Sequence, residues 1–193
     1  SDGLPIGAVS GFCNMLQRYV EGNTGADAPT HVAVIFDKGS HTFRNDMYDL
    51  YKANREAMPE DLRPQMPLTR AATKAFNIAC EEKEGFEADD IIATYARQAR
   101  EQDMECVIVS SDKDLMQFID EKVKMLDMMK DKIYGPKEVF EKMGVHPNQI
   151  VDYLSLLGDS SDNIPGVKGI GAKGAASLLA QFPTLDEVIE NIE

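Results

Sequence analysis

Two short apolar runs in this chain are each followed at once by acidic residues. Residues 30–36 (THVAVIF) and 105–110 (ECVIVS) are rich in β-branched side chains, which is typical of buried strands. Asp37 follows the first run, and Asp112 and Asp114 follow the second. Because the carboxyl ends of the strands in a doubly wound sheet meet at one edge, we expect the three carboxylates to converge there.

Segments with apolar residues at helical spacing alternate with these strands. Strands alternating with helices predict an α/β fold with a parallel-type central sheet flanked by helices, followed by a helical C-terminal part. Short strands are also predicted at 123–127 and 132–134, a loop at 23–29, and a proline-containing loop or arch at 56–67. The predicted helices span residues 6–21, 44–55, 63–79, 88–100, 113–119, 136–143, 147–157, 172–181 and 185–192.

Charge and cysteine content limit the partners and the compartment. Across 193 residues, 20 basic against 33 acidic side chains give a net charge of −13, which normally disfavours nucleic acid as a partner. The 3 cysteines are widely spaced, which argues against disulfides and a structural zinc site and fits a cytoplasmic protein. The sequence contains neither a membrane-spanning apolar stretch nor a secretion signal, so we expect no membrane partner.

Two further groups of acidic residues recur along the chain. Glu87, Asp89 and Asp90 open a predicted helix, and Asp159 and Asp162 follow another. Helix caps and turn chemistry would explain each group taken alone. Gathered at one sheet edge, however, the carboxylates would repel one another and raise each other's pKa unless cations lay among them. Ligand sets made only of oxygen suit Mg²⁺ or Mn²⁺, and two such ions can promote the displacement of a phosphoryl group.

Six short motifs are spread along the chain. They are FDKGSHTFR at 36–44, YKANR at 51–55, GFEADD at 85–90, SDKDL at 111–115, LGDSSDNIPGV at 157–167 and GIGAK at 169–173. Together they resemble the motifs of the 5′-nuclease (flap-endonuclease) family, which includes the 5′-3′ exonuclease domain of bacterial DNA polymerase I. They follow the order of the family and cover essentially the whole chain.

This resemblance implies a PIN-like α/β nuclease core over residues 1–135, with a helical arch region at about 44–67. It also implies a helical subregion over 136–193 that contains a helix–hairpin–helix at about 155–181. In the family, two Mg²⁺ ions, which Mn²⁺ can replace, promote hydrolysis of DNA at a 5′ flap or nick in replication and repair. A monomer is implied, with a polymerase domain elsewhere in the parent chain. The implied metal ligands are Asp37, Glu87, Asp89, Asp90, Asp112, Asp114, Asp159 and Asp162.

Basic and aromatic side chains cluster in the predicted helix at 44–55. Tyr51, Lys52 and Arg55 lie on about one helical turn. A fixed cation there would stabilise charge developing on a scissile phosphate, and the tyrosine face would stack on a base. The alternative is that the two cations are solvated and that Tyr51 is partly core. In view of the resemblance, we predict that these three residues are catalytic and that Arg44 binds DNA.

A glycine-rich segment precedes the predicted helix at 172–181. Closely spaced glycines let backbone N–H groups approach a phosphate at a helix N-terminus, and neighbouring lysines add charge. Taken alone, the pattern is more often a simple turn. By resemblance it is the hairpin of a helix–hairpin–helix, in which a K⁺ ion links loop carbonyls to DNA. The DNA-binding residues predicted here are Gly166, Lys168, Gly169, Gly171 and Lys173.

One departure from the family concerns the start of the chain. Family members begin with a central strand that ends in Asp-Gly and supplies a further metal ligand. We expect this chain to be an internal piece lacking that strand, poorly stable and weakly active. Two other interpretations stay open: a DNA-binding fragment without catalysis, and a ribonuclease of the PIN-like class. The hairpin after Asp162 argues against the second.

Overall fold

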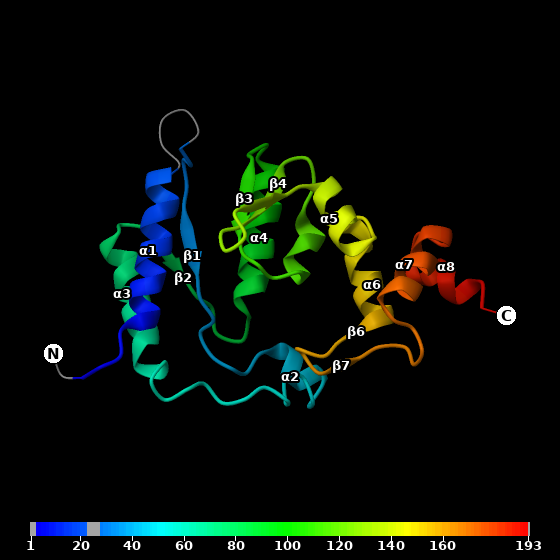
Figure 1. Cartoon of the computed structure of the whole chain (residues 1–193), viewed down its shortest axis with the longest axis horizontal. Coiled ribbons are helices and arrows are strands. Elements are labelled where there is room, and N and C mark those ends of the chain that lie inside the picture. The colour runs from blue at the N-terminus through cyan, green and yellow to red at the C-terminus, as the bar shows by residue number, and fades with distance from the viewer. Residues whose placement is uncertain (1–2, 23–27, 193) are drawn as a thin grey trace. The chain divides into compact units, whose positions relative to one another are not determined.

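The computed structural model describes residues 3–22 and 28–192, so most of the loop predicted at 23–29 lies outside the described residues. The chain forms two compact units. One contains Ser1–Thr42 and Glu56–Ala88, and the other contains Phe43–Arg55 and Asp89–Glu193. Figure 1 labels their helices and strands.

In the first unit, a pair of helices packs together beside a pair of strands (Figure 1). Strand β1 (Ala33–Ile35) pairs in parallel with β2 (Ala79–Glu81). Helix α1 (Gly7–Gly22) packs against α3 (Met66–Ala75), which continues from the short 3₁₀ helix η2 (Arg63–Gln65).

A single glutamine ties these helices together. Gln65 Oε1 accepts the backbone N–H groups of Ala8 at 2.9 Å and Val9 at 3.3 Å. Both groups lie in the first turn of α1, where no partner exists within the helix itself. The side chain from η2 therefore caps a helix that is distant in sequence.

The second unit contains a three-stranded sheet. Strands β3 (Cys106–Val109) and β4 (Val123–Asp127) are parallel, and β4 is antiparallel to β5 (Lys132–Tyr134). The connection between β3 and β4 contains the 3₁₀ helix η3 (Asp114–Phe118). Helix α4 (Ala88–Glu101) leads into β3 along the chain and belongs to this unit from Asp89 onward. The short helix α2 (Phe43–Met47) also belongs to this unit.

Helices make up most of the chain after β5. They are α5 (Pro136–Met143), η4 (Pro147–Gln149), α6 (Ile150–Leu157), α7 (Ala172–Gln181) and α8 (Leu185–Glu190). Between α6 and α7, the two-residue strands β6 (Gly158–Asp159) and β7 (Ile164–Pro165) form an antiparallel hairpin. Gln149 Nε2 donates to the carbonyls of Leu179 and Pro183, both at 3.0 Å, and so joins η4 to the end of α7.

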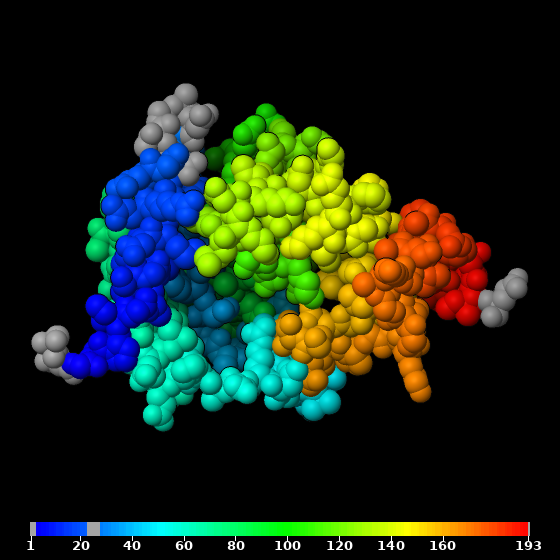
Figure 2. Space-filling view, viewed as in Figure 1, coloured from blue at the N-terminus to red at the C-terminus, as the bar shows by residue number. Residues whose placement is uncertain are grey.

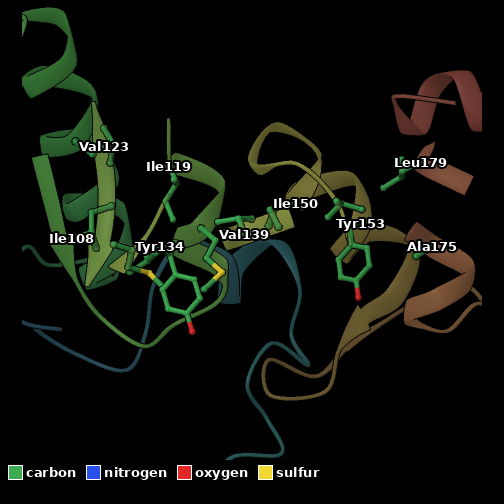
Figure 3. Packing of buried hydrophobic residues seen from close by; sticks show 14 of the residues in the cluster. Ile108, Ile119, Val123, Tyr134, Val139, Ile150, Tyr153, Ala175 and Leu179 are labelled. Atoms are coloured by element: carbon green, nitrogen blue, oxygen red, sulfur yellow. The ribbon is translucent and has the colours of Figure 1, made fainter. Parts of the chain in front are cut away.

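The main buried core lies in the second unit and runs from the sheet into the helices (Figure 3). Ile108 and Val123 pack at the sheet end, Val139 and Ile150 lie in the middle, and Leu179 lies at the helical end. This continuous core fixes the loop after β3 and the hairpin after α6 on one packed body.

Most of the predicted elements are confirmed, with three corrections. The predicted helix at 44–55 is wrong beyond Met47, because turns follow and Lys52 adopts a left-handed backbone with φ 55°. The predicted helix at 63–79 ends at Ala75, since Asn77 is also left-handed with φ 58°. The sequence reading missed β2, β6 and β7. None of the helices in the described ranges is long and apolar enough to cross a bilayer.

Candidate functional site

The eight predicted metal ligands are divided between the two units. Asp37 and Glu87 belong to the first unit, and the other six belong to the second. Asp37 follows β1, and its Oδ1 accepts the N–H of Ala88 at 2.7 Å. That hydrogen bond fixes the carboxylate at the first residue of α4, directly after Glu87.

Arg70 supports Asp37 from α3 and was missed by the sequence reading. Its Nη2 donates to the carbonyl of Asp37 at 2.6 Å, and its Nε donates to Glu82 at 2.7 Å. The guanidinium carbon also lies 4.7 Å from the ring centre of Phe36. The hydrogen bond to Arg70 holds the pKa of Glu82 below its usual range. Arg70 therefore fixes the end of the strand that carries Asp37.

In the second unit, the loop after β3 carries two acids in a tight turn. Ser110 Oγ accepts the N–H of Asp112 at 3.1 Å, and Asp112 Oδ1 accepts the N–H of Asp114 at 3.0 Å. Such side-chain hydrogen bonds to the following backbone favour Ser and Asp at turns. Asp114 begins η3, and its buried Oδ1 accepts no hydrogen bond from any described residue.

The hairpin after α6 places Asp159 beside this loop. Gly158 and Gly166 cross so closely that a Cβ at Gly158 would lie 2.3 Å from the backbone N of Gly166. Asp159 Oδ1 accepts the N–H of Ser161 at 2.7 Å. Its Oδ2 lies 2.5 Å from Lys113 Nζ, which is also 3.7 Å from Asp114 Oδ1.

The pKa values of Asp114 and Asp159 are shifted in opposite directions. Burial raises the pKa of Asp114; the Lys113 ammonium opposes this, and the charges of Asp112, Asp159 and Asp162 add to the rise. Burial also acts on Asp159, but the hydrogen bonds from Lys113 and Ser161 prevail and lower its pKa. The mutual repulsion expected from the sequence is therefore present at Asp114.

The chemistry of the cluster fits a hard divalent cation. The donors are all carboxylates, and one buried oxygen, Asp114 Oδ1, accepts no hydrogen bond from a described residue. As the side chains stand, no three His, Cys, Asp or Glu residues in the described ranges are close enough together to hold a metal. The Lys113 ammonium lies among them instead and supplies positive charge.

Asp162 lies on the same hairpin but faces the predicted catalytic residues. Arg55 Nη2 lies 2.7 Å from Asp162 Oδ1, the Tyr51 hydroxyl donates to Oδ2 at 3.1 Å, and Lys52 Nζ is 3.9 Å from Oδ2. Figure 1 shows the segment after α2 beside β6 and β7, and in Figure 2 the atoms near residue 50 lie against those near 160. In the structure, the three predicted catalytic residues therefore all lie around one predicted metal ligand, Asp162.

Arg44, predicted to bind DNA, is paired within the second unit. Its two terminal nitrogens, Nη1 and Nη2, each lie 2.8 Å from an oxygen of Asp90. Asp89 and Asp90 both occupy the first turn of α4, where carboxylates also interact favourably with the helix dipole. This paired arrangement of guanidinium and carboxylate joins α2 to α4.

The glycine-rich segment before α7 is exposed. Gly166, Lys168, Gly169, Gly171 and Lys173 are all solvent-accessible, and Gly169 has a left-handed backbone with φ 89°. Gly171 is the N-cap of α7 and has no side chain with which to cap the N–H groups of the first turn. The segment therefore offers backbone donors and two ammonium groups on one exposed stretch of chain.

Two family models together span the chain. Residues 1–144 match the 5′-3′ exonuclease N-terminal resolvase-like domain, and residues 145–193 match the 5′-3′ exonuclease C-terminal SAM fold. A DNA polymerase I from Rhizobium leguminosarum is 56% identical over 193 residues, which cover 98% of this chain and 19% of that protein. A 5′-3′ exonuclease from Bacillus subtilis is 40% identical, over 98% of this chain and 64% of that protein. The chain thus spans about a fifth of the polymerase relatives.

Solved structures share the fold. The 5′-exonuclease of bacteriophage T5 with bound zinc matches with a TM-score of 0.83 at 22% identity, over 95% of this chain and 70% of that one. A T5 flap endonuclease in complex with DNA and metal ions matches with a TM-score of 0.77 at 23% identity, over 95% and 70% of the two chains. These likenesses confirm the predicted α/β class of fold.

Proposed function

Because the chain belongs to the 5′-3′ exonuclease family, we propose that it hydrolyses DNA phosphodiesters near a 5′ end, with divalent metal ions as cofactors. The observation that carries this proposal is the carboxylate cluster of the second unit. Asp114 has a buried oxygen that accepts no hydrogen bond from the part of the chain that the structure describes, and its pKa is raised by burial and by three neighbouring carboxylates. Such an arrangement favours the binding of cations.

The residues that would hold metal are Asp112, Asp114 and Asp159, with Asp162 once it leaves its basic partners. Asp37, Glu87, Asp89 and Asp90 stay predictions from the family resemblance. When bound, divalent ions would stabilise the charge of the reacting phosphate and lower the pKa of a water molecule. Mg²⁺ is the proposed ion, Mn²⁺ its substitute, and a K⁺ ion is proposed at the hairpin.

The chain's own basic groups would hold and orient the DNA. Tyr51, Lys52 and Arg55 lie around the carboxylate of Asp162, which supports a role for them in binding a single anionic group. Lys168, Lys173 and the exposed glycine amides would bind phosphates of the duplex arm. Phosphate contacts carry no base information, which suits a nuclease that recognises a 5′ flap or nick by its shape.

We further propose that the protein acts as a monomer in the cytoplasm, together with a polymerase domain. Support for the last point comes from the DNA polymerase I relatives, of which the chain spans about a fifth. The competing function is DNA binding without catalysis. The ion pairs of Arg55 with Asp162 and of Lys113 with Asp159 favour neither function, because either pair can open when a ligand binds.

A duplex with a 5′-labelled flap tests the proposal. The wild-type chain should release short labelled products in Mg²⁺ and none in EDTA, while Asp114→Asn should bind the flap but cleave it at least about 100-fold more slowly. Lys137→Ala, which changes an exposed lysine on α5, is the control and should cleave like the wild type. Binding without cleavage in Mg²⁺ and Mn²⁺ would instead support the non-catalytic function.

A further inference from the structure

Three side chains that carry a positive charge or a hydroxyl group surround the carboxylate of Asp162, as they would surround a bound anion. They are the Arg55 guanidinium at 2.7 Å, the Tyr51 hydroxyl at 3.1 Å and the Lys52 ammonium at 3.9 Å. The side chain of Asp162 is only 16% exposed, whereas that of Arg55 is 54% exposed. The carboxylate is thus enclosed, while its main cationic partner remains open to solvent.

The backbone around this contact is also tied together. Lys52 N–H donates to the carbonyl of Asp162 at 2.9 Å, and Asn163 Nδ2 donates to the carbonyl of Leu50 at 2.7 Å. Lys52 and Asn163 both have left-handed backbones, with φ 55° and φ 58°. Residues other than glycine adopt this conformation at a cost, so it persists where surrounding contacts enforce it. The docking of residues 50–55 on 160–163 is therefore specific.

We propose that Tyr51, Lys52 and Arg55 form a phosphate-binding cradle that Asp162 fills in the DNA-free protein, and that a DNA phosphate binds by displacing Asp162. A carboxylate and a phosphate accept hydrogen bonds from an arginine fork in the same way. The inference rests on the proposed function and adds to it that one acidic residue competes with the substrate. Asp162 is a positioning residue in this role.

If Asp162 competes with a DNA phosphate, the effects of substitutions at Arg55 and Asp162 on DNA affinity should not be additive. In the wild type, DNA affinity is reduced by the fraction of molecules whose cradle is occupied by Asp162. Removing Arg55 deletes a phosphate contact, but it also deletes the main partner of the competing carboxylate. The loss of affinity caused by Arg55→Ala should therefore be small when Asp162 is present and large when it is absent.

A double-mutant cycle in EDTA tests this, with a fluorescent 5′-flap duplex and four proteins: wild type, Asp162→Asn, Arg55→Ala and the double variant. Asp162→Asn should tighten binding about 10-fold. Arg55→Ala should weaken the wild type about 2-fold and weaken Asp162→Asn about 10-fold or more. Asp49→Asn makes the same charge change on an exposed residue of the same segment and should tighten binding less than 2-fold.

Amide hydrogen exchange gives a readout that does not depend on DNA. Without the carboxylate, residues 50–55 should exchange several-fold faster in Asp162→Asn than in the wild type, and at the wild-type rate in Asp49→Asn. Should Asp162→Asn fail to melt cooperatively, Asp162→Ser, which keeps a small acceptor, replaces it in both measurements.

The outcomes separate the two claims. Equal effects of Arg55→Ala in both backgrounds, or unchanged exchange at 50–55, would overturn the cradle while leaving the nuclease proposal intact. If none of the proteins binds the flap duplex, the proposed function fails, and the displacement by a DNA phosphate fails with it.

Discussion

The ammonium of Lys113 lies 2.5 Å from Asp159 Oδ2 and links the loop after β3 to the hairpin after α6. Although burial disfavours its charge, the hydrogen bond to Asp159 and the nearby carboxylates raise the pKa of Lys113. This contact helps to lower the pKa of Asp159, whereas Asp114, whose Oδ1 lies 3.7 Å from the same nitrogen, keeps a raised pKa. Two acids around one lysine thus affect the stability of the fold in opposite directions.

We predict opposite effects of neutralising these two acids in metal-free protein at pH 7. Asp159→Asn should lower the free energy of unfolding by about 1–3 kcal/mol, because a charged hydrogen bond is lost. Asp114→Asn should raise it by up to about 1 kcal/mol, because a repelled carboxylate is removed. Urea unfolding in EDTA measures both, and a loss of stability in Asp114→Asn would contradict the assignment.

The pH dependence of these variants follows from the directions of the pKa shifts. The lowered pKa of Asp159 contributes stability above the pKa of the unfolded chain, and this is lost as the pH falls through the folded value. The raised pKa of Asp114 removes stability as the pH rises from the unfolded to the folded value. Both differences from the wild type should therefore vanish in acid, which urea titrations between pH 3 and 7 would reveal.

Arg44 should stabilise the second unit through its paired contact with Asp90. Arg44→Ala should cost about 1–2 kcal/mol of unfolding free energy, and Arg44→Lys should recover only part of it because an ammonium lacks the planar fork. Arg97→Ala is the control, since Arg97 and Glu101 form an exposed pair at 3.7 Å. Equal losses for Arg44→Ala and Arg97→Ala would show that the paired contact between Arg44 and Asp90 contributes nothing to stability.

The close approach of Gly158 and Gly166 in the hairpin should leave no room for a side chain at Gly166. A Cβ at Gly166 would lie 2.2 Å from the carbonyl group of Leu157, so Gly166→Ala should destabilise the protein by at least about 2 kcal/mol. Gly174→Ala, in α7 with its nearest neighbour at 3.7 Å, should instead stabilise by about 0.5–1 kcal/mol. Thermal melting of the two variants should shift in opposite directions.

Lys173 should contribute to DNA binding through charge alone. Lys173→Ala should weaken binding to every duplex sequence alike and reduce the slope of log K against log salt by roughly one. The melting temperature should stay unchanged, because the side chain is exposed. A change of preference between DNA sequences would show that Lys173 contacts bases instead.

The sequence was sufficient where local pattern decides structure. The β-branched runs became β1 and β3, and Asp37 and Asp112 lie in the loops that follow them. Helix α4 begins at Ala88 as predicted, because the acids of its first turn and its apolar spacing agree. Asp114 also shows the repulsion that clustered carboxylates were expected to produce.

Long-range contacts explain what the sequence reading missed. Tyr51 and Arg55 have helical spacing, but the backbone N–H of Lys52 donates to Asp162 instead of to a preceding turn. Strand β2 has three residues, one of them Glu81, and gave no apolar alternation to detect. Arg70 resembles any helical surface arginine in sequence, and only the fold brings it to Asp37.

The close crossing of Gly158 and Gly166 also has an entropic consequence for the acids between them. Asp159 and Asp162 lie inside a short loop whose two ends approach so closely that a Cβ at either glycine would overlap the backbone of the other. The conformational freedom of this loop is therefore lost when the chain folds, so the binding of the proposed cation would cost little further entropy. Lengthening the loop should restore that freedom and weaken the proposed cation binding even with every carboxylate retained.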